Sequence, residues 1–163
     1  MSFANMFDEA DTAKPPGKGG TYFPVGTFIV RIDKFFQHMN QAKIPGVIAE
    51  CTVLHSTNPE LPAGSAVSWM QRAGKKGWEG RVREFVAEVQ GVPYAEVLKD
   101  VLFTASGPLN PLGGKVCMAT GKNDKTLAGT PIVAVQWERL PPADLVAWTA
   151  HAKTVGVAAP ALD

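Results

Sequence analysis

The hydrophobic pattern changes its period in the middle of this chain of 163 residues, and this change constrains the fold most strongly. Before residue 72, apolar and polar residues alternate, as in strands that bury one face. From Trp78 to Val89, apolar residues fall at offsets 0, 4, 7, 8 and 11, which predicts an amphipathic helix. After residue 114 the alternation returns. We therefore expect a mainly β protein with an inserted helical segment.

Glycine, proline and polar residues separate the expected elements. The helix that starts at Trp78 stops at Gly91, and a second helical pattern runs from Pro93 to Leu102. A short helix is expected at 144–152. The expected strands are 25–36, 47–55, 65–71, 115–121 and 131–140, with polar connecting loops at 37–46 and 122–130.

Three strands, a helical segment and two strands follow each other in the order of the OB-fold, a five-stranded Greek-key barrel. An SH3-like barrel would lack the long helix, and a ferredoxin-like fold would need a helix after the first strand. The sequence therefore predicts an OB-fold-like β-β-β-α-β-β domain at 21–140. Residues 1–20, rich in proline and glycine at 14–20, are expected to form a flexible tail, and 141–163 a short C-terminal helix and tail.

Composition excludes several classes of protein. A hydrophobic fraction of 45% and a charged fraction of 19% fit a soluble globular chain. No apolar run approaches the roughly 20 residues that span a bilayer, and the acidic start carries no apolar signal region. Cys51 and Cys117 are too few for a disulfide framework or a four-cysteine zinc site. We expect a cytoplasmic protein without a membrane partner.

Charge is uneven along the chain although the net charge is only +1. Residues 1–13 hold three acids and no base, whereas residues 14–83 hold ten Lys and Arg against four acids. The densest basic cluster surrounds two glycines and an indole, a mixture that suits phosphate contact and base stacking. It comprises Arg72, Lys75, Lys76, Trp78, Arg81 and Arg83. The alternative interpretation is a solvated turn whose Trp78 plugs the end of the barrel.

Other candidate contacts lie on strands and in loops. Trp69 could stack a base from the third strand or belong to the core, as could Trp137. The neighbours Phe35 and Phe36 could stack bases or cap the barrel. Arg31 is expected to point outward, to pair with Asp33 or to meet a phosphate. The expected loop lysines are Lys43, Lys122 and Lys125.

Signs of catalysis are few. The three histidines have no metal-ligand spacing, and no serine motif resembles a nucleophile elbow. Cys51 alternates with apolar core positions, which predicts a buried structural thiol. We therefore expect a protein that is not an enzyme, with no metal and no cofactor. An unrecognised nuclease or hydrolase site remains an alternative.

With these features, the chain resembles phage-encoded single-stranded-DNA-binding proteins of the OB type. The residues that carry the resemblance are 24–27, 51–54, Asn58, Pro59, 64–69 and 135–138. The resemblance implies coating of single strands during phage DNA replication or recombination in the host cytoplasm. Many such proteins end in an acidic tail that recruits partners, but this chain ends almost uncharged at 158–163, and its acids instead lie near Phe3 and Phe7.

The leading hypothesis is therefore binding of single-stranded DNA with little sequence preference. Phosphates would meet the basic cluster and the loop lysines, and bases would stack on Trp69, with Phe36 or Trp78 as lesser candidates. The alternative is a protein–protein module of the same fold, which would bind a replication or host protein through the N-terminal tail. Either hypothesis allows a homo-oligomer.

Overall fold

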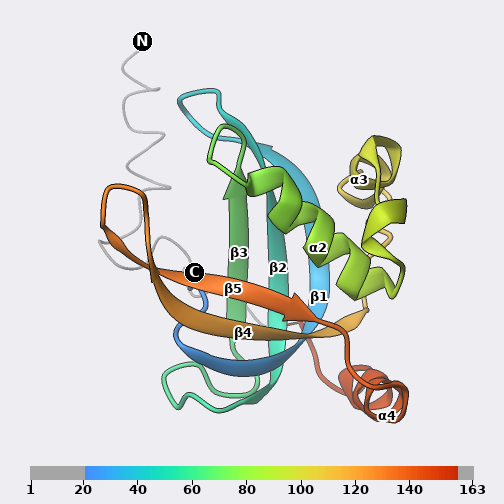
Figure 1. Ribbon diagram of the computed structural model, residues 1–163. Coiled ribbons are helices and arrows are strands. Elements are labelled where there is room, and N and C mark those ends of the chain that lie inside the picture. The colour runs from blue at the N-terminus through green and yellow to red at the C-terminus, as the bar shows by residue number, and fades with distance from the viewer. Residues whose placement is uncertain (1–20, 158–163) are drawn as a thin grey trace, which may run out of the picture.

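The computed structural model describes residues 21–157, whose strands form one five-stranded antiparallel sheet of order β3-β2-β1-β4-β5 (Figure 1). The strands are β1 (Gly26–Met39), β2 (Pro45–Ser56), β3 (Ala66–Arg72), β4 (Val116–Lys125) and β5 (Pro131–Glu138). The helices are α2 (Trp78–Gln90), α3 (Lys99–Ala105) and α4 (Pro142–Ala152), with a 3-10 turn η1 (Tyr94–Glu96). The expected mainly β fold with an inserted helical segment is confirmed, but the sheet is not closed into a barrel. The predicted N-terminal tail lies outside the described residues.

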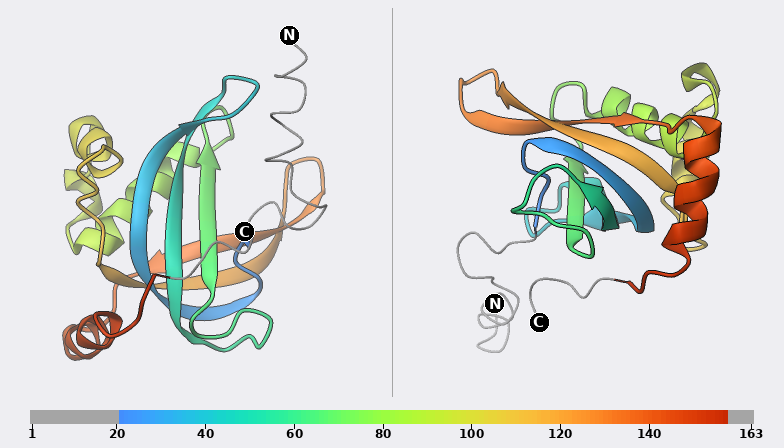
Figure 2. Two further views of the ribbon diagram at one scale, coloured as in Figure 1. Left: turned by 180° about the vertical axis from the view of Figure 1, so that it is seen from behind. Right: turned by 90° about the horizontal axis from the view of Figure 1, so that it is seen from below.

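Strand β1 organises the sheet because it pairs with two neighbours. It pairs with β2 along most of its length and with β4 from Gly26 to Arg31. Its register with β2 shifts between Ile29 and Val30 and again between Ile32 and Lys34. Such bulges bend a strand and increase its twist. As a result, the β4–β5 hairpin crosses the layer formed by β1, β2 and β3 (Figures 1 and 2).

The core lies between the inner face of this sheet and helix α2. The predicted apolar stripe of α2 is confirmed, since Val82, Phe85, Val86 and Val89 are all buried. Phe85 stands among aromatic rings, with its centroid 4.9 Å from that of Trp69 and 4.6 Å from that of Trp137. Aromatic pairs at such distances stabilise a core beyond their buried area alone.

The connections differ from those expected. β1 continues to Met39 and β2 begins at Pro45, so the turn between them is shorter than the expected loop 37–46. The expected loop 122–130 is shorter than predicted, because its first four residues continue β4, which pairs with β5 as far as Lys125 and Pro131. This end of the hairpin is exposed on both faces, so no apolar alternation marks it in the sequence.

The second helical pattern is interrupted and the last helix is confirmed. Val97 and Leu98 leave the helical conformation, which divides the segment 93–105 into η1 and α3. Helix α4 packs against the outer face of the sheet, in a cluster of Leu54, Val116, Leu140 and Ala152. Among residues 21–157, no helix has both the length and the apolar character needed to cross a membrane.

Candidate nucleic-acid interface

The basic turn between β3 and α2 is built by glycines and held by an arginine. We use "basic turn" for residues 72–81. Gly74 has φ +89° and Gly77 has φ +78°, a region of backbone conformation that favours glycine. Arg81 donates from Nε to Oε1 of Gln71 at 2.6 Å and from Nη1 to the carbonyl of Lys76 at 3.0 Å. Arg81 therefore fixes the shape of the turn as well as adding charge.

The cations of the basic turn face solvent. Arg72, Lys75, Lys76 and Arg81 are all exposed. Within residues 21–157, the ion pairs are those of Arg31 with Asp33 and Arg139 with Glu88, so none of these four cations is held in an ion pair. With one acid, Glu79, among its residues, the turn carries four unpaired cations and a net charge of +3, as the sequence pattern indicated.

An apolar row crosses the outer face of β1, β2 and β3 beside this turn. Phe36 is paired in register with Ile48, and Ile48 with Met70. Their strand neighbours Phe35, Ala49 and Trp69 are buried in the core, so the row points to the opposite face. All three side chains of the row are partly exposed.

Positive charges flank this row on both sides. Lys34 Nζ lies 4.7 Å from the centroid of the Phe36 ring, within cation–π range. On the other side, Arg72 pairs with Gly46, which pairs with His38. We call Lys34, Phe36, Ile48, Met70 and Arg72 the open patch. It combines an exposed aromatic ring with cations, as single-strand binding requires.

A β-bulge at Asp33 decides which phenylalanine belongs to the open patch. Strict alternation from Phe28, Val30 and Ile32 would turn Phe36 inward. Because the register shifts between Ile32 and Lys34, Phe35 turns inward and is 0% exposed. The sequence alone therefore did not indicate Lys34, and it left Phe36 between stacking on a base and capping the barrel. The outward position of Met70 could have been predicted, because alternation along the strand places it on the face opposite to that of Trp69.

The strand tryptophans belong to the core. Trp69 is 5% exposed and Trp137 is 2% exposed, with their ring centroids 5.5 Å apart. The alternative that Trp69 is a core residue is thus the one that the structure bears out, and Trp69 is not offered to a base. Alternation of Val67 and Trp69 on one face of the strand was the signal for this.

Trp78 belongs partly to the core and partly to the surface. It is the first residue of α2, it packs against the core cluster, and it remains partly exposed. Its exposed edge lines a surface groove rather than the open patch.

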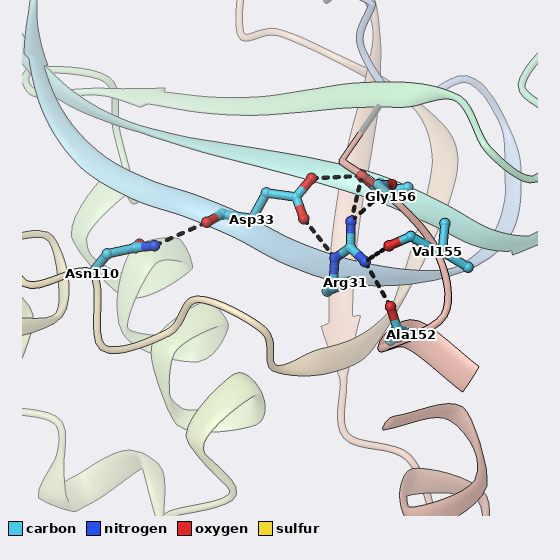
Figure 3. Close-up of polar contacts among 7 residues, drawn as sticks. Arg31, Asp33, Asn110, Ala152, Val155 and Gly156 are labelled. Atoms are coloured by element: carbon cyan, nitrogen blue, oxygen red, sulfur yellow. Dashed lines mark hydrogen bonds and ion pairs between the residues drawn. The ribbon is translucent and has the colours of Figure 1, made fainter. Parts of the chain in front are cut away.

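Arg31 lies on the outer face of the sheet, as predicted, but it is buried there and does not face solvent (Figure 3). Its Nε donates to Oδ1 of Asp33 at 2.6 Å, which confirms the predicted pairing. Nη1 donates to the carbonyls of Ala152 at 2.7 Å and Val155 at 2.5 Å. Nη2 donates to Thr52 Oγ1 and to the carbonyl of Gly156, each at 3.2 Å. All five N–H donors are occupied, so Arg31 leaves the candidate interface.

Arg31 marks the part of the outer face that residues 152–156, from the last residue of helix α4 onward, cover. Thr52, its neighbour across β1 and β2, is 0% exposed, and Leu54 is also buried. Ile29 packs in the same cluster with Val155. We call Ile29, Arg31, Thr52 and Leu54 the covered patch.

The remaining candidate lysines lie at different places. Lys43 is in the β1–β2 turn, next to the basic turn, because the backbone N–H of Ala73 donates to the carbonyl of Pro45 at 2.9 Å. Lys122 and Lys125 are exposed on the β4–β5 hairpin, which projects to one side of the β1–β3 layer (Figures 1 and 2). The structure therefore brings Lys43 and the basic turn together, and the hairpin lysines stand apart.

The thiols of the chain are inert by their surroundings. Burial raises the pKa of Cys51 well above its ordinary value and raises that of Cys117 to about 12. Both are buried, as predicted for Cys51. In the described range 21–157, no group of three or more His, Cys, Asp or Glu side chains could hold a metal ion.

Comparison with known proteins leaves the site to be judged on its geometry. The chain matches no protein-family model, and no curated protein matches it significantly.

Proposed function

We propose that this protein binds single-stranded DNA without catalysis and with little sequence preference, through the open patch and the basic turn. The observation that carries the proposal is the outward row of Phe36, Ile48 and Met70 between Lys34 and Arg72. A strand of DNA needs this combination, because its bases stack on exposed rings while its phosphates meet cations.

The arrangement of elements supports an OB-like interpretation of the fold. The antiparallel order β3-β2-β1-β4-β5, with a helix between β3 and β4, is compatible with an open form of that barrel. OB-folds bind oligonucleotides on the face of their second and third strands. Ile48 and Met70 stand on the outer face of β2 and β3, which is where such a ligand would lie.

Each part of the site has a separate physical role. Phe36 would stack on one base, and Ile48 and Met70 would extend the apolar surface beneath the neighbouring bases. Arg72, Lys75 and Lys76 would meet phosphates and release counterions. Because none of these groups reads base edges in a fixed pattern, every base would be accepted. The resemblance seen in the sequence would assign this activity to phage DNA replication or recombination.

The test is the anisotropy of a labelled oligo(dT), titrated at about 20 mM and again at about 300 mM salt. The variant Lys75→Ala with Lys76→Ala should weaken binding at low salt about tenfold and lower the salt slope by about 1.4, or 0.7 per lost phosphate contact. The matched control, Lys115→Ala with Lys153→Ala, removes the same charge from exposed positions outside the site. Equal losses in the two variants, or affinity independent of salt, would contradict the proposal.

The second candidate function is a protein–protein module. It is favoured by a separate observation, the exposed apolar groove beside α3. A chain that shows no salt-dependent binding of oligo(dT) would favour this candidate instead.

A further inference from the structure

An apolar groove opens where α2, α3 and the ends of β1 and β2 meet. It encloses about 780 Å³, and α3 stands beside α2 at this side of the sheet (Figure 1). Its apolar lining residues include Met39, Trp78, Val82, Leu98, Leu102 and Phe103. The open patch lies on the outer face of the sheet, so the groove is separate from it, whereas Trp78 and Glu79 at the end of the basic turn line the groove.

Several large apolar side chains of the groove remain exposed to solvent. Met39 is 60% exposed, Leu98 61% and Phe103 70%. Val82 is buried beneath them and Trp78 is partly buried. Large apolar side chains gathered in one exposed hollow mark a docking site, because their contact with water is unfavourable.

The start of the chain carries a matching set of anchors. Phe3, Met6, Phe7 and Ala10 follow the spacing i, i+3, i+4 and i+7. Side chains at these intervals lie along one side of a helix, and this is the pattern by which an amphipathic helix enters an apolar groove. Met39, which lines the groove, adds a flexible side chain that packs well against aromatic rings.

The charges are complementary as well. The segment carries Asp8, Glu9 and Asp11 and no base before Lys14. Arg83 and Lys99 line the groove with one acid, Glu79. Lys75 and Lys76 lie three and two residues before Trp78, the first residue of α2, which lines the groove. An acidic segment is therefore favoured at this rim over a basic one.

The connecting chain is long enough to reach. Tyr22 bridges to Ser68 on β3, and Arg72 lies four residues further along that strand, about 13 Å away. Gly46, the partner of Arg72, itself lines the groove. The ten residues 11–20 can span up to about 33 Å when extended.

We propose that residues 3–10 dock in this groove of their own chain, with Phe3, Met6 and Phe7 against Leu98, Leu102 and Phe103. The docking does not depend on DNA binding, so either proposal can fail without the other.

Disulfide formation between two introduced cysteines tests the docking in the full-length chain. The variant Met6→Cys with Leu98→Cys places one thiol on the segment and one in the groove. In the control, Met6→Cys with Leu127→Cys, the second thiol stands at a 91% exposed position on the β4–β5 turn. Cys51 and Cys117 are buried, so they do not compete. At about 1 μM protein, a thiol on the same chain acts at an effective concentration near millimolar, so cross-links within one chain dominate.

We expect the groove variant to form a monomeric cross-linked species at least about tenfold faster than the control. Adding Phe7→Ser to the groove variant should return its rate to that of the control. Equal rates in the two variants would overturn the proposal. A cross-linked dimer at this concentration would also overturn it, because a second copy would then be the occupant.

Discussion

The outer face of β1 and β2 has two halves that the chain treats differently. In the covered patch, Arg31 and Thr52 are buried beneath residues 152–156, and every N–H donor of the Arg31 side chain binds an acceptor within the protein. In the open patch, Phe36 and Ile48 remain partly exposed, and Lys34 and Arg72 form no ion pair among the described residues. The boundary is the bulge at Asp33. The difference shows that cations on one sheet face bind within the fold where the chain covers them and remain unpaired and exposed where it does not.

The largest effect is expected from the covered patch. Arg31→Ala should lower the free energy of unfolding by about 3–5 kcal/mol, because it leaves Asp33 and three backbone carbonyls without their buried donor. Urea denaturation measures this change. The control Arg139→Ala removes an exposed ion pair with Glu88 and should cost no more than about 1 kcal/mol. Similar losses in both would mean that Arg31 does not hold the covered patch together.

An intermediate effect is expected from the open patch. Phe36→Ala should weaken oligo(dT) binding by about 1–3 kcal/mol, or about 5- to 150-fold, because a stacked base loses its ring. Phe36→Leu preserves apolar volume but not the aromatic face, so it should lose nearly as much affinity. Anisotropy measures both variants, with denaturation as a check on the fold. If Phe36→Leu bound like the wild type, Phe36 would act by packing rather than stacking.

The smallest expected effect is a gain of DNA affinity beside the open patch rather than a loss. Glu50 is exposed beside the open patch, in register with Lys34 and Ser68. Glu50→Gln should strengthen oligo(dT) binding about twofold at low salt, since it removes a screened repulsion from phosphate. Glu84→Gln makes the same charge change on the exposed side of α2 and should leave affinity unchanged. An equal gain in both variants would indicate a response to net charge alone.

Periodicity was sufficient for the architecture but not for the details of the site. Alternation through Val67 and Trp69 and the stripe through Phe85 predicted the core, since burial selects apolar residues at regular intervals. Periodicity did not predict the bulge at Asp33. A bulge adds one residue to the strand, so every side chain after it points to the face opposite to the one that strict alternation predicts. The burial of Arg31 was missed for another reason, since the three backbone carbonyls that it binds lie 121 to 125 residues away in the chain.

The most direct test of the central claim is a methyl NMR titration with oligo(dT) at low salt. Each patch has its own reporters: Ile48 and Met70 stand in the open patch, whereas Ile29 and Met118 pack against the covered cluster with Val155. The account predicts that the methyl signals of Ile48 and Met70 shift with added DNA while those of Ile29 and Met118 stay in place. Unchanged signals at Ile48 and Met70, or equal shifts at all four residues, would contradict it.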